Sequence, residues 1–86
     1  MRDANHILGE SFLETRAKLL EIAATLDRID RAAEDESPLS TGSQPKRALI
    51  DDAIRICLSE GPDRAERLQK LFSRQYESDW RKSMDV

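Results

Sequence analysis

The chain has 86 residues, a net charge of −3, one cysteine and one histidine, and 36% of its residues are charged. This length predicts one domain. A lone cysteine excludes an intramolecular disulfide, and one cysteine with one histidine is too few for a structural zinc site. The chain has no apolar run of membrane-spanning length and no apolar signal segment at its start. We therefore expect a small cytoplasmic protein without membrane contact, and such small domains often gain stability by oligomerising.

An apolar heptad repeat occupies the N-terminal third of the chain. Eight residues follow one another at alternating spacings of four and three, and we call them the heptad stripe: Leu8, Phe12, Thr15, Leu19, Ile22, Leu26, Ile29 and Ala33. This spacing predicts a helix over about residues 7–35, capped by Asn5 or, as a later alternative, by Ser11. A helix with such a stripe needs a surface to pack against. The apolar members of the stripe are therefore the predicted oligomer or partner contacts: Leu8, Phe12, Leu19, Ile22, Leu26, Ile29 and Ala33.

A second apolar group lies beside the stripe in the first two-thirds of this helix. Its members are Leu13, Ala17, Leu20 and Ala24. The two groups together predict contacts on two sides of the helix. The charged face is expected to pair internally, Glu14 with Lys18 and Asp27 with Arg31. Only the narrow stripe continues from Asp27 to Ala33, so a partner contact is expected to be clearest there.

The rest of the chain predicts a linker over residues 36–44, two shorter helices and a loose tail over 77–86. The second helix is expected over about residues 45–60, where Gly61, as a left-handed residue just past the helix, and Pro62 end it. The third is expected over about 63–76, opened by a capping-box pattern of an aspartate and a glutamate three residues later. The predicted fold is therefore all-α: a single domain, 1–86, in which one long helix and a shorter antiparallel helix pair form a small bundle completed by oligomerisation.

The remaining candidate side chains point to structural roles. His6, with Glu10 one turn later, is expected to be a surface or capping histidine because the chain has no further metal ligand of that kind. Cys57 lies among apolar residues and is expected to be a small buried hydrophobe. Tyr76 and Trp80 are expected to clamp the C-terminus onto the bundle. We predict no catalytic residue, cofactor or metal, and no enzymatic activity.

The predicted function is self-association as a helical interaction or adaptor protein. The partner is expected to be the chain itself, in a homodimer or tetramer, or another helical protein. An alternative rests on the basic face formed by Arg67, Lys70 and Arg74 in the third helix, which suits weak nucleic-acid binding by a regulator. Acidic residues dilute this face, and the first half of the chain is acidic, so self-association is the preferred prediction.

Overall fold

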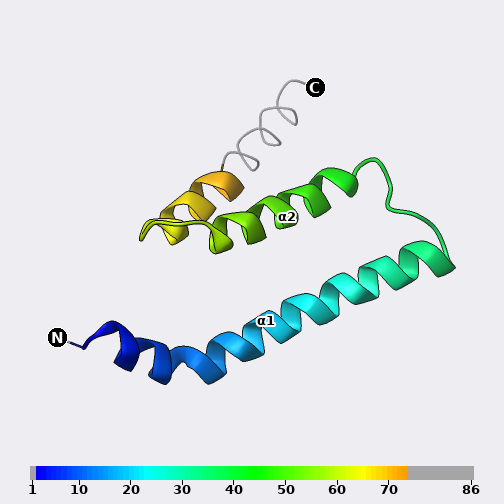
Figure 1. Cartoon of the computed structure of the whole chain (residues 1–86). Coiled ribbons are helices and arrows are strands. Elements are labelled where there is room, and N and C mark those ends of the chain that lie inside the picture. Colours follow the sequence, from blue (N-terminus) through cyan, green and yellow to red (C-terminus); the bar gives the residue numbers. More distant parts are fainter. Residues whose placement is uncertain (1, 74–86) are drawn as a thin grey trace. The chain divides into compact units, whose positions relative to one another are not determined.

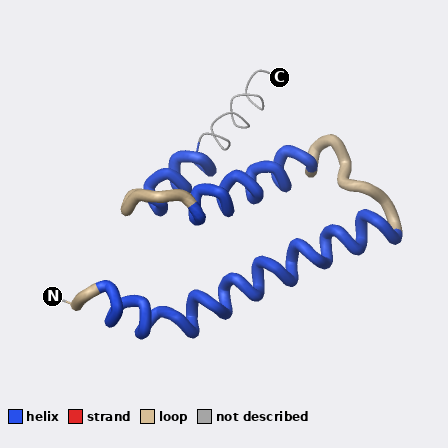
Figure 2. Tube along the Cα trace, in the orientation of Figure 1, coloured by secondary structure: helices blue, strands red, loops and turns tan. Residues whose placement is uncertain are grey.

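The computed structural model describes residues 2–73, which form helices joined by turns and loops (Figures 1 and 2). Helix α1 comprises Ala4–Asp35 and helix α2 comprises Gln44–Leu58. A third helix follows over residues 64–73 and contacts α2. The all-α prediction of a long N-terminal helix and a shorter helix pair is confirmed.

The chain divides into two compact units, Met1–Pro38 and Leu39–Val86. The boundary falls inside the predicted linker, where proline, glycine and serine residues prevent helical periodicity. The first unit contains α1. The second contains α2 and the third helix, which we call the α2 helix pair. The single-domain organisation of residues 1–86 stays a prediction.

Helix α1 begins three residues before the predicted start because Asp3, and not Asn5, caps it. The Asp3 carboxylate accepts a hydrogen bond from the backbone N–H of His6 at 2.9 Å. The carbonyl of Asp3 also accepts from the N–H of Ile7 at 3.1 Å. Ala4 and Asn5 lie outside the heptad repeat, so the repeat alone could not show that the first turn includes them. The helix ends at Asp35, at the predicted end.

Helix α2 has a proline in its first turn, where the missing backbone N–H costs no hydrogen bond. It ends at Leu58, two residues before the predicted end. There the backbone N–H and the hydroxyl of Ser59 both donate to the carbonyl of Ile56, at 3.1 and 2.6 Å. Ser59 therefore closes the last turn of α2, and the chain leaves the helix before it reaches Gly61.

The turn after α2 depends on Gly61, which has a φ of 107° as the sequence predicts. A Cβ atom at this position would lie only 3.0 Å from Oδ1 of Asp63. Both observations favour glycine, since L-residues rarely adopt this backbone conformation and the added carbon would crowd a carboxylate. The chain then reverses, and the third helix runs back beside α2 (Figure 1).

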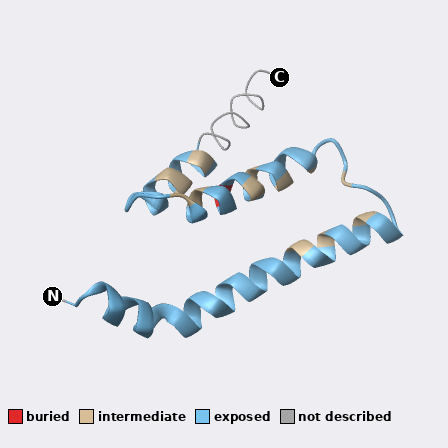
Figure 3. Cartoon of the chain, viewed as in Figure 1, coloured by how far each residue is buried: buried red, intermediate tan, exposed pale blue. Residues whose placement is uncertain are grey.

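The α2 helix pair has a small apolar centre around Ala53. Ala53 is 9% exposed and is the one residue of the described chain that is buried (Figure 3). Leu49 and Ile56 of α2, together with Leu68 and Leu71 of the third helix, are half-buried. Leu49, Ala53 and Ile56 follow at spacings of four and three, so they share one side of α2. The small side chain of Ala53 allows close packing at this centre.

Cys57 is exposed, so the prediction that it is a buried hydrophobe is wrong. Cys57 follows Ile56 by one residue and is therefore rotated by about 100° from the side of α2 that is covered. With Ile50 and Ile54 it forms a second apolar stripe, and both isoleucines are also exposed. The pair of helices covers one of the two apolar stripes of α2 and leaves the other open.

Candidate interaction surface

The heptad stripe of α1 is open to solvent over its N-terminal half. Leu8 is 64% exposed, Phe12 56% and Leu19 61%. Helix α1, every residue of which the structure describes, contains no buried side chain. The later stripe residues, Leu26, Ile29 and Ala33, are half-buried. The most exposed apolar area of α1 thus lies before the Asp27–Ala33 stretch in which we expected the clearest partner contact.

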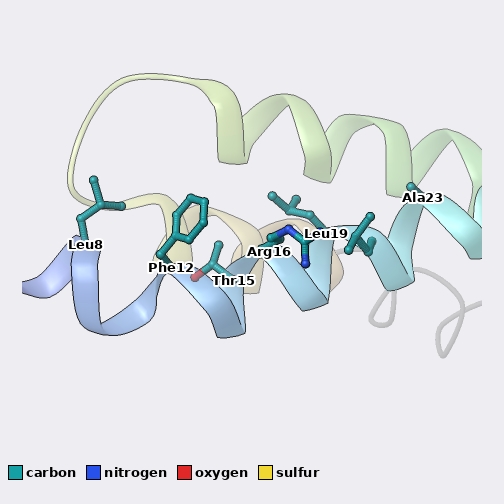
Figure 4. A pocket seen from close by; sticks show the side chains of 7 residues that line it. Leu8, Phe12, Thr15, Arg16, Leu19 and Ala23 are labelled. Atoms are coloured by element: carbon teal, nitrogen blue, oxygen red, sulfur yellow. The ribbon is translucent and has the colours of Figure 1, made fainter.

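The second apolar group widens this exposed area. Leu13 is 75% exposed and Leu20 is 54% exposed, and Ile22 of the stripe is also exposed. One open hollow on the helix surface is lined entirely by α1 residues (Figure 4): Leu8, Phe12, Thr15, Arg16, Leu19, Leu20 and Ala23. We call this part of α1, residues 8–23, the apolar face. Its aliphatic and aromatic surface suits the apolar side of another helix.

Arg16 is the one cation among the residues that line this hollow, and Figure 4 shows it between Thr15 and Leu19. Its neighbours one helical turn away are all large and apolar: Phe12, Leu13, Leu19 and Leu20. Among the described residues Arg16 has no ion pair. Arg16 is not among the residues predicted above, although the identity of its helical neighbours is a signal that the sequence contains.

The other charges of α1 divide into paired and unpaired groups. Lys18 Nζ lies 3.2 Å from Glu14 Oε1, which confirms that predicted pair. The predicted pair of Asp27 with Arg31 is wrong, because neither side chain has an ion pair within residues 2–73. Asp27 therefore has no ion pair among the described residues, and it lies on the half of the helix that follows the apolar face.

His6 and Glu10 lie side by side at the start of α1. His6 Nε2 lies 2.9 Å from Glu10 Oε1, and Arg2 forms a further ion pair with Glu10. All three side chains are about half exposed or more, so this cluster is a solvated surface group, as the sequence predicts for His6. Within residues 2–73 no three His, Cys, Asp or Glu side chains are placed to hold a metal ion.

Two arginines of the third helix form hydrogen bonds with the turn that precedes it. One of them, Arg67, belongs to the predicted basic face. The Arg67 guanidinium donates to Asp63 Oδ1 at 3.1 Å and to the carbonyl of Glu60 at 3.0 Å. Arg64 donates to the carbonyl of Ser59 at 2.6 Å. Both carbonyls lie just past the C-terminus of α2, where cations stabilise a helix. These two arginines therefore fix the turn between the helices.

Asp63 does not act as the predicted capping box requires, because its carboxylate accepts from the Arg67 side chain. Lys70 Nζ lies 3.3 Å from Glu66 Oε1, so that cation is also compensated within its own helix. Arg74, Tyr76 and Trp80 lie outside the described residues. The two described members of the predicted nucleic-acid face, Arg67 and Lys70, are thus each paired with a carboxylate of their own segment.

Replacing Arg67 with alanine is expected to destabilise the α2 helix pair by about 1 kcal/mol, because an ion pair and a bond to the turn are both lost. The matched variant Lys70→Ala removes one exposed pair and is expected to cost only about 0.3 kcal/mol. Urea unfolding followed by circular dichroism measures both values. Equal losses in the two variants would show that Arg67 does not fix the turn.

The comparisons with protein-family models, with curated proteins and with solved structures give no match. No helix in residues 2–73 is both long and apolar enough to cross a bilayer. The exposed hydrophobic side chains indicate association with a partner.

Proposed function

We propose that this chain is a non-enzymatic, self-associating interaction module whose contact surface is the apolar face of α1. The observation that carries the proposal is the exposure of large apolar side chains at heptad spacing, above all Leu8, Phe12 and Leu19. Large contiguous apolar patches on a soluble protein mark interaction sites. The heptad spacing further specifies a second helix as the natural occupant.

The exposed apolar side chains of α1 favour association when a partner covers them. The large ones retain about half of their surface: Ile7, Leu8, Phe12, Leu13, Leu19, Leu20 and Ile22. Fully burying one large aliphatic side chain contributes about 1.5–3 kcal/mol, so covering several of them in each copy stabilises an assembly.

Sedimentation equilibrium over a micromolar concentration series tests the proposal directly. We expect the average mass to rise with concentration from 9.8 kDa toward the mass of a dimer or tetramer. A single 9.8 kDa species throughout the series contradicts self-association. Weak nucleic-acid binding, the alternative, has no comparable support, because Arg67 and Lys70 are paired with acidic side chains of their own segment.

A further inference from the structure

We propose that the occupant of the apolar face is a second copy of this chain whose α1 runs antiparallel to the first, so that Arg16 of each copy meets Asp27 of the other. This inference rests on the proposed self-association and adds the orientation and the register. It is carried by two opposite charges that have no ion pair in the described chain, and by the order of large and small residues along the heptad stripe.

Arg16 and Asp27 cannot satisfy each other within one helix. They are eleven residues apart, which separates them by about 16 Å along the axis. A parallel second copy does not help, because each residue is then level with its own counterpart and the separation stays the same. Antiparallel pairing reverses the order of residues in the second helix, and it can therefore bring each arginine to an aspartate of the partner.

The side-chain sizes along the heptad stripe also favour antiparallel pairing. When two stripes overlap completely in antiparallel order, the residues at facing levels are Leu8 with Ala33, Phe12 with Ile29, Thr15 with Leu26 and Leu19 with Ile22. The small or polar members, Thr15 and Ala33, each face a leucine. Parallel pairing instead places Phe12 against Phe12 and Thr15 against Thr15. Alternating large with small residues across an interface gives the better packing.

In this register Arg16 is level with Thr25 of the partner subunit. The partner's Asp27 is then about 3 Å away along the axis. It lies on the same side of the heptad stripe as Arg16 but about 130° round its helix from the stripe, so the arginine side chain must be extended to reach it. Sliding the helices by one heptad, so that the contact is centred on the N-terminal half, makes Arg16 level with Lys18 of the partner subunit and leaves the two copies of Arg16 about 3 Å apart along the axis, on the same flank. Like charges at such flanking positions oppose pairing, so charge excludes the shorter overlap.

The overall charge of α1 also favours antiparallel pairing. Residues 21–35 carry five acidic and two basic side chains, a net charge of −3, whereas residues 4–20 carry two of each. A parallel dimer places the two acidic segments side by side. An antiparallel dimer places each acidic segment beside the neutral segment of the other copy, which lowers the repulsion.

Distance measurements between spin labels distinguish the two orientations. In a Cys57→Ser background, one variant carries Glu21→Cys and a second carries Arg31→Cys. Antiparallel pairing predicts a short distance for the label at 21, since that residue lies near the two-fold axis. It predicts an axial separation of about 32 Å for the label at 31. Sedimentation of the same samples establishes that they are dimeric.

Three other outcomes overturn the inference and separate it from the proposed function. Short distances at both positions in a dimer overturn only the antiparallel orientation. Long distances at both show that α1 is not the contact, and a monomeric sample contradicts self-association; either of these removes the proposed function as well.

A charge swap tests the contact itself. Arg16→Asp is expected to weaken dimerisation roughly tenfold or more, because two pairs are lost per dimer. Adding Asp27→Arg to the same chain is expected to restore the affinity. Arg31→Asp, the same change elsewhere on α1, is the control and is expected to have less than one third of the effect. If the double variant dimerises as weakly as Arg16→Asp, the proposed register is wrong.

Discussion

Replacing Phe12 and Leu19 together with glutamate is expected to raise the dissociation constant of the self-associated form at least about 100-fold. Each substitution removes a large apolar contact from both copies and introduces a carboxylate that must lose water on binding. Both side chains are more than half exposed in the chain, so α1 itself is expected to stay helical. Sedimentation equilibrium measures the association, and circular dichroism measures the helix content.

The control is the double variant Ile54→Glu with Leu58→Glu. It makes the same kind of change on α2, where Ile54 is exposed and Leu58 is 87% exposed. We expect the control to associate like the unaltered chain. An equal loss of association in the control would show that the exposed apolar residues of α2 contribute to the contact as much as those of α1. That result would contradict the proposed function.

The fold could be predicted because the helices have clear local signals. The heptad spacing needs a helix, and the proline, glycine and serine residues of the linker interrupt helical periodicity. Gly61 was predicted to adopt a left-handed conformation, and its φ of 107° confirms this. Capping was harder to predict. Asp3 and Asn5 are both good N-cap residues, and only the hydrogen bond to His6 decides between them.

Which apolar residues are covered within the chain could be predicted only in part, because one sequence pattern fits two environments. On α2 the stripe of Leu49, Ala53 and Ile56 and the stripe of Ile50, Ile54 and Cys57 have the same spacing and differ by one residue. Which stripe is covered depends on where the third helix packs, and spacing within α2 does not contain that information. The prediction that Cys57 is buried failed for this reason.

The basic face of the third helix shows the same difficulty for charges. Helical spacing correctly places Arg67 and Lys70 near each other, and from the sequence alone such a group resembles a phosphate-binding surface. The structure shows that Arg67 donates to a carbonyl of the preceding turn. The chain reversal brings this carbonyl close to Arg67, and no pattern in the sequence predicts that contact. The surroundings of Arg16, in contrast, can be predicted from the sequence, because helical spacing alone determines its apolar neighbours.

Replacing Ala53 with glutamate is expected to destabilise the α2 helix pair by about 2–4 kcal/mol. Ala53 is 9% exposed and is the buried centre of the described part of this pair, so a longer side chain here enters a covered position. A glutamate here must either lose its water or push the two helices apart. Urea unfolding followed by circular dichroism gives the change in free energy.

Ala48→Glu is the matched control for this prediction, because Ala48 belongs to the same helix and is exposed. Alanine and glutamate have similar helix propensities, and an acidic side chain near the start of a helix is favourable. The control is therefore expected to change the stability by less than about 0.5 kcal/mol. A difference between the two variants thus reports the packing of the helix pair and not the helix propensity of α2. Equal stabilities would mean that the third helix does not cover Ala53 in solution.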